Sequence, residues 1–173
     1  MDANKKCVIC GRAAVFYSSY LKQELCKKHF ERMLIKRVKS NINLYKINNK
    51  SFKLENQNKC GKEFLKFIFK GMESSGGKKL SSYTLEDFAI CVMKFFLFHD
   101  AADKRINNRS FSPLFNVSEN EIISFFNLKN IKLQSVDRNR KDKVVLDFLK
   151  EIEERRPGGM ISVVKVGMKL GII

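Results

Sequence analysis

Two short stretches decide the fold: Cys7-Val8-Ile9-Cys10-Gly11-Arg12 and, further on, Glu24-Leu25-Cys26-Lys27-Lys28-His29. They contain four residues of metal-ligand type in two pairs, with two residues between the members of each pair. Side chains spaced in this way reach one ion, and two such pairs about fifteen residues apart complete a tetrahedron. Three thiolates and one imidazole are a closed coordination typical of structural Zn²⁺. The predicted zinc ligands are Cys7, Cys10, Cys26 and His29.

The alternative interpretation is that the cysteines are ordinary core residues and the histidine lies on the surface. Four matches at these spacings are hard to obtain by chance, so we favour the metal site. Gly11 follows the first pair and suits a tight turn whose amides point toward the sulfurs. Cys91 has no ligand-type neighbour and is expected in the core, whereas His99 is expected at a helix end, where a cation suits the dipole.

The composition indicates a polyanionic partner. The chain has 173 residues, enough for one domain or a domain and a half, and 44% of them are hydrophobic. Lys and Arg number 34 against 18 Asp and Glu, which gives a formal charge of +16 and an isoelectric point near 9.8. A chain this basic repels itself, and nucleic acid is the first candidate for its partner.

The sequence also excludes several classes of protein. No apolar run approaches the length of a membrane span, and no signal peptide precedes Cys7, so we expect no membrane partner. The five cysteines do not form the pattern of a disulfide framework. Free thiols suit a reducing compartment, which predicts a cytoplasmic protein.

The basic residues gather in three places. After His29, apolar residues recur at helical spacing and predict a long helix to about Tyr45. Residues 1–50 contain twelve Lys and Arg but three Asp and Glu, so we favour a phosphate-contacting ridge over a merely solvated face. Two shorter basic segments follow. The predicted RNA-contact residues are Lys5, Lys6, Arg12, Lys27, Lys28, Arg32, Lys36, Arg37, Lys39, Lys104, Arg105, Arg109, Arg138, Arg140, Lys141 and Lys143.

The rest of the chain alternates short strand-like and helical segments. Thr84-Leu85-Glu86-Asp87 resembles a capping box and opens the strongest apolar helical stripe, and Ser118-Glu119-Asn120-Glu121 is a second capping box. Asn130 to Val136 has the composition of a further strand. The tail from Met160 is apolar and basic, which favours either a terminal strand or a segment that orders on a partner.

The order of these segments resembles the tRNA thiolation enzymes of the PP-loop ATPase superfamily, the two-thiouridine and two-thiocytidine synthetases. In that family a zinc knuckle precedes an adenylating domain. The segment from Lys79 to Asp100 resembles the family's strand, His-Asn-Leu-Asp-Asp-like turn and helix. Ser112-Pro113-Leu114 with Ser118 to Ile122, and Asp147 to Gly158, resemble two later family segments.

Together with the segment pattern, the resemblance implies a helix-rich α/β fold with a small parallel sheet. The expected organisation is a zinc-binding module (1–30), a basic connecting helix (31–50), a reduced PP-loop-like core (51–156) and a basic apolar tail (157–173). The chain departs from the family at its chemistry. The phosphate loop Ser-Gly-Gly-Lys-Asp-Ser has its nearest match in Lys59-Cys60-Gly61-Lys62-Glu63-Phe64, which lacks one glycine and both serines. The family's paired cysteines and its C-terminal zinc module have no counterpart.

These departures lead us to predict a non-catalytic, zinc-containing protein bound to structured RNA. The first expected partner is rRNA, as a ribosome-associated or ribosomal protein with other ribosomal proteins as neighbours. The alternative is a tRNA-binding accessory subunit, or a minimal enzyme, of tRNA thiolation. A DNA-binding zinc protein ranks last, because the sequence contains no recognisable DNA-recognition motif.

Overall fold

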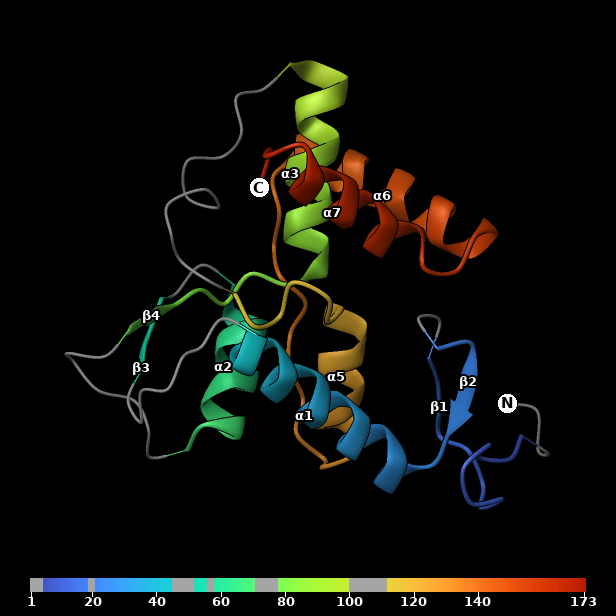
Figure 1. The fold of residues 1–173 in the computed structure, drawn as a ribbon. Coiled ribbons are helices and arrows are strands. Elements are labelled where there is room, and N and C mark those ends of the chain that lie inside the picture. Colours follow the sequence, from blue (N-terminus) through green and yellow to red (C-terminus); the bar gives the residue numbers. More distant parts are fainter. Residues whose placement is uncertain (1–4, 19–20, 45–51, 56–57, 71–77, 100–111) are drawn as a thin grey trace.

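The computed structural model describes residues 5–18, 21–44, 52–55, 58–70, 78–99 and 112–173, and these are the described residues below (Figure 1). Lys104, Arg105 and Arg109, three of the predicted RNA contacts, lie outside them. The elements in chain order are β1 (Phe16–Ser18), β2 (Gln23–Leu25), α1 (Lys27–Leu44), β3 (Phe52–Leu54), α2 (Lys59–Ile68), β4 (Lys78–Leu80), α3 (Leu85–Phe98), α5 (Glu119–Asn127), α6 (Arg140–Arg155) and α7 (Gly159–Lys169).

The predicted helix-rich α/β class is confirmed. β1 and β2 form an antiparallel hairpin, and β3 pairs in parallel with β4. The parallel pair is the small sheet that the segment pattern predicted, with three residues in each strand. Among the described residues, no helix is both long enough and apolar enough to cross a bilayer.

The helices form two packed groups (Figure 1). In the first, α1, α2 and α5 enclose an apolar cluster around the fully buried rings of Phe30, Phe64 and Phe125. Cys7 and Cys26, two of the predicted metal ligands, belong to the same cluster. The hairpin β1–β2 and the loop before it are therefore continuous with this core. In the second group, α3 packs against α6 and α7 through a separate cluster that includes Leu149 and Val164.

Both predicted capping boxes are present. The side chain of Asp87 accepts the backbone amide of Thr84 at 2.9 Å, and that of Glu121 accepts the amide of Ser118 at 3.0 Å. In each box the acidic side chain accepts the amide of the N-cap residue, and its negative charge also suits the helix dipole. The helix α3 ends where the sequence indicated, with His99 as its left-handed C-cap.

Two expectations about strands are wrong. The apolar tail is the helix α7 instead, because Met160, Ile161 and Val164 lie at helical spacing and pack on α3. Gly167 allows this packing, since a Cβ there would collide with Val92. The segment from Asn130 to Val136 contains no strand. Its apolar residues Leu133 and Val136 instead pack as side chains against the first cluster.

Candidate metal centre and basic groove

The four predicted ligands come together from a loop and a helix start. Gly11 has a φ of 69°, and its amide donates to the carbonyl of Cys7 at 2.8 Å, which closes the turn that carries the first pair. Cys26 immediately precedes α1, and His29 lies in the first turn of that helix. The hairpin β1–β2 brings the two pairs to the same place.

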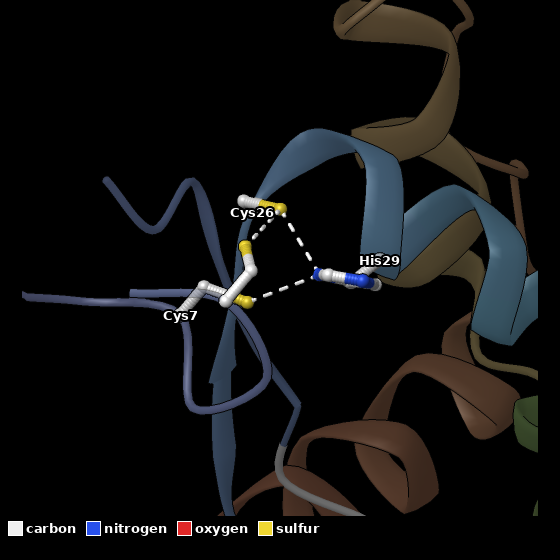
Figure 2. A group of neighbouring side chains, drawn as sticks. Cys7, Cys26 and His29 are labelled. Carbon is white, nitrogen blue, oxygen red and sulfur yellow. Dashed lines mark hydrogen bonds between the residues drawn. The ribbon is translucent and has the colours of Figure 1, made fainter. Parts of the chain in front are cut away.

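The distances between the ligand atoms fit a single ion. All four atoms lie within 4.8 Å of one another. The sulfur of Cys26 is 3.7 Å from that of Cys10 and 3.4 Å from Nδ1 of His29, which is also 3.4 Å from the sulfur of Cys7 (Figure 2). Metal bonds of about 2.3 Å to sulfur and about 2.1 Å to nitrogen give tetrahedron edges of roughly 3.5 to 3.8 Å. This group could therefore hold a metal ion.

The thiol environment also favours a cation. Burial raises the pKa of Cys7, but hydrogen bonds to the backbone of Cys26, Ile9 and Cys10 outweigh it and lower that pKa to about 6. Hydrogen bonding to the backbone of Arg12 lowers the pKa of Cys10, yet burial and the neighbouring cysteines raise it overall. One thiolate thus forms readily, whereas a second beside it is disfavoured unless a metal ion compensates the charge.

A groove of about 1100 Å³ lies beside the metal-ligand group. One wall consists of Arg12, Ala13 and Val15, from the segment between Cys10 and β1, and the other is one face of α1. The cations that line it are Arg12, Lys27, Lys28, Arg32, Lys36 and Lys39, against a single acid, Glu31. We call this feature the basic groove.

The cations of the basic groove follow the helix axis. Lys28, Arg32 and Lys36 recur every fourth residue, which places them on one face with about 6 Å of rise between neighbours. They are exposed, as are Arg12 and Lys39. None of these five forms an ion pair with another of the described residues. Their charge is therefore available to an anionic partner.

The remaining predicted RNA contacts are placed differently. Lys5 pairs with Glu24, Lys27 donates to the carbonyl of Leu128, and Lys143 pairs with Asp137. All three lysines remain exposed, as do Lys6, Arg140 and Lys141. Lys141 lies 4.2 Å above the ring of Phe98.

Arg37 and Arg138 are corrections to the predicted contacts. The side chain of Arg37 is 9% exposed, and its guanidinium donates to Glu121 at 2.9 Å, which joins α1 to α5. The side chain of Arg138 is 7% exposed, and its guanidinium pairs with Asp87 and Glu119. Because both charges are already compensated inside the protein, we assign them to packing rather than to phosphate contact.

The sequence did not reveal the cluster around Arg138. The amide of Asn58, the N-cap of α2, donates to Asp87 at 2.6 Å and to Glu119 at 2.9 Å. Both oxygens of Glu86 accept the backbone amide of Glu119 at 3.0 Å. The starts of α2, α3 and α5 therefore meet at one buried network. The two capping-box segments contain the acids of this network, Glu86, Asp87 and Glu119, but no sequence pattern indicated that Arg138 pairs with them.

Burial within this network raises the pKa of two acidic side chains, Glu86 and Asp87. Burial, and then the charge of Glu119, raises the pKa of Glu86 to about 8. Burial also raises the pKa of Asp87, although Arg138 opposes the shift. The nearby thiol of Cys60 has its pKa raised to about 12 by burial and by the same carboxylates, so it is protonated and chemically quiet.

The resemblance to thiolases is confirmed for the fold. The chain superposes on the U34-tRNA thiolase NcsA from Methanococcus maripaludis, a structure solved with its [4Fe-4S] cluster, with a TM-score of 0.76. The match covers 97% of this chain and 87% of that one at 12% sequence identity. No protein-family model and no curated protein sequence matches the chain.

This match corrects the prediction that the protein is not an enzyme, because the fold that it shares over nearly its whole length is that of an enzyme. We had inferred a loss of activity from the phosphate-loop residues that are missing between Lys59 and Phe64. The structure places Lys59 to Phe64 within α2, the element that follows β3 in the chain. The ribosomal part of the prediction gains no support from the comparisons.

Cobalt binding tests the metal-ligand group. Addition of Co²⁺ to the reduced protein is expected to produce the visible absorption of a tetrahedral thiolate site, saturating at one ion per chain. Cys10→Ser should abolish the band, since the exposed Cys10 contributes one of the three sulfurs. Cys91→Ala, which leaves the four ligands intact, should retain it. An unchanged band in Cys10→Ser would show that the four residues do not act as one site.

The raised pKa of Glu86 predicts that the stability of the folded protein depends on pH. Unfolded, this group loses its proton near its ordinary value of 4.5, whereas the folded protein retains the proton up to about pH 8. Between these values unfolding releases a proton, so the folded state loses stability as the pH rises. Glu86→Gln should therefore show a smaller fall in melting temperature from pH 5 to pH 8 than the unaltered protein. The exposed control Glu151→Gln should behave like the unaltered protein, and identical pH profiles for all three would contradict this reading.

Proposed function

We propose that this protein binds tRNA and takes part in tRNA thiolation. The observation that carries the proposal is the basic groove on a fold shared with a tRNA thiolase, because five of the cations that line it form no ion pair within the part of the chain that the structure describes. The groove supplies what an RNA backbone requires, which is a row of exposed positive charge in a concave surface. A cytoplasmic location follows from such a partner and is part of the proposal.

The geometry of the groove suits one RNA strand running along α1. The rise of about 6 Å between Lys28, Arg32 and Lys36 is similar to the separation of neighbouring phosphates along a strand. Arg12 approaches from the opposite wall and could contact the same backbone. Recognition of this kind reads the shape and charge of paired RNA, since the base edges of an RNA duplex are hard to reach.

For the metal-ligand group we propose one Zn²⁺. Three sulfurs and one nitrogen form a closed ligand set, which is typical of structural zinc. In an iron–sulfur cluster each iron takes its own protein ligand, so the ligand atoms surround a larger object. Here they lie within 4.8 Å of one another, which favours a single ion. The other two cysteines of the chain, Cys60 and Cys91, are buried apart from the group.

A charge-reversal pair tests binding in the groove. Arg32→Glu with Lys36→Glu should weaken tRNA binding at least tenfold and reduce the slope of log affinity against log salt by about 1.4 to 1.8, the value for two lost phosphate contacts. Fluorescence anisotropy with labelled tRNA measures both quantities. Lys150→Glu with Arg155→Glu makes the same change of charge on α6, where both residues are exposed.

The control pair should leave the salt slope close to that of the unaltered protein. Equal losses in both pairs would indicate attraction by net charge alone and would contradict binding in the groove. Participation in thiolation is tested separately by mass spectrometry of thiolated nucleosides in tRNA from cells that lack the protein. An unchanged set of thiolated nucleosides would refute that part of the proposal.

A further inference from the structure

The C-terminal end of α3 has an uncovered apolar surface. Its last four residues, Phe95, Phe96, Leu97 and Phe98, are between 37% and 51% exposed. Successive residues of a helix point in different directions, so this end is uncovered on more than one side. A helix that is apolar all round is normally buried, and a contiguous exposed patch of this kind marks an interaction site.

The first turns of α6 extend this surface. Lys94 of α3 pairs with Asp142 at 2.8 Å, and Nζ of Lys141 lies 4.2 Å from the centre of the Phe98 ring, so the two helices meet here. Val144 follows Lys141 by three residues, and Phe148 follows Val144 by four. These spacings place the three side chains along the same face of α6. They are 61% and 46% exposed. We call Phe95, Phe98, Lys141, Val144 and Phe148 the aromatic strip.

The charge beside the aromatic strip selects its partner. The exposed Arg140, Lys141 and Lys143 surround the start of α6, and the nearby acid Asp142 is already paired with Lys94. A second copy of this chain would bring a further formal charge of +16 toward the same surface, which opposes self-association. Exposed rings beside basic side chains are the combination that binds single-stranded nucleic acid, where bases stack and phosphates pair.

We propose that the aromatic strip stacks unpaired bases of RNA. This inference rests on the proposed function, because it adds a second contact for the same kind of ligand. The basic groove binds the backbone of paired RNA, whereas the aromatic strip binds nucleotides whose bases are free to stack. Among the described residues, Phe98 and Phe148 pair with no other aromatic ring. Lys141 lies over one face of the Phe98 ring, which leaves the other face of Phe98 and the exposed ring of Phe148 for a base.

A tryptophan placed in the strip reports stacking directly. The chain contains no tryptophan, so Phe98→Trp introduces a single fluorophore. Titration with a single-stranded oligoadenylate should quench its emission, and a blunt RNA duplex of equal length should quench it much less. Phe67→Trp is the matched control, since Phe67 is 43% exposed and also has a lysine, Lys129, near its ring. Its ring lies edge to face with Phe125 and Phe126, so the control should show little quenching.

A second variant separates stacking from general apolar contact. Phe98→Leu with Phe148→Leu keeps an apolar surface but removes both ring faces, and circular dichroism checks its fold. Its affinity for the single-stranded oligonucleotide should fall about tenfold or more, while its affinity for the duplex is unchanged. An undiminished affinity would overturn the inference. So would a lower sedimentation coefficient in the leucine variant than in the unaltered protein, because it would assign the strip to contact between copies.

The two proposals fail in different ways. If the unaltered protein binds tRNA but Phe98→Trp shows no quenching, the stacking site is refuted and the basic groove stands. If the unaltered protein binds neither tRNA nor the duplex, the proposed function is refuted. Quenching by the single strand alone would then show a stacking site without the groove function.

Discussion

The convergence of three sulfurs and one nitrogen within 4.8 Å is the constraint on which the rest of the structure depends. Such a group is stable only as thiols or around a cation, because thiolates at this separation repel each other. A metal ion held by this group would join the loop of Cys7 and Cys10 to the first turn of α1. Since Cys7 and Cys26 also lie in the main apolar cluster, the same ion would fix where α1 begins and how the hairpin packs on the core. The basic groove has one wall from each of these two parts.

Buried ion pairs hold the helices together away from the metal. Arg37 joins α1 to α5 through Glu121, and Arg138 joins the starts of α3 and α5 through Asp87 and Glu119. Removal of either arginine would leave buried carboxylates without a positive charge beside them, which costs more than the pair contributes relative to apolar residues. The protein thus pairs Arg37 and Arg138 internally and leaves the cations of the basic groove exposed. This division, rather than net charge, decides which of these basic residues are available to an anionic partner.

The features that we predicted correctly from the sequence depend on residues close together in the chain or on the order of segments. Ligand spacing predicted the grouping of the four metal-type residues, capping boxes predicted the starts of α3 and α5, and segment order predicted the shared fold. The errors concern contacts between distant segments. Arg37 and Arg138 resemble their exposed neighbours in the sequence, and their acidic partners lie far away or in another helix. The tail is the helix α7, and Gly167 lets it lie close against Val92 of α3, a contact between distant segments that no local pattern indicates. The missing loop residues led us to predict a protein that is not an enzyme, and the fold shared with a thiolase contradicts that prediction.

The most direct test of the central claim is the tRNA affinity of the protein before and after removal of its metal. If the metal-bound hairpin forms one wall of the basic groove, stripping the ion with a chelator under reducing conditions should weaken tRNA binding and flatten its salt dependence. Reloading with Zn²⁺ should restore both, and circular dichroism would follow the helices throughout. Equal affinity of the stripped and reloaded protein, with the metal content verified, would contradict a groove built on the metal centre.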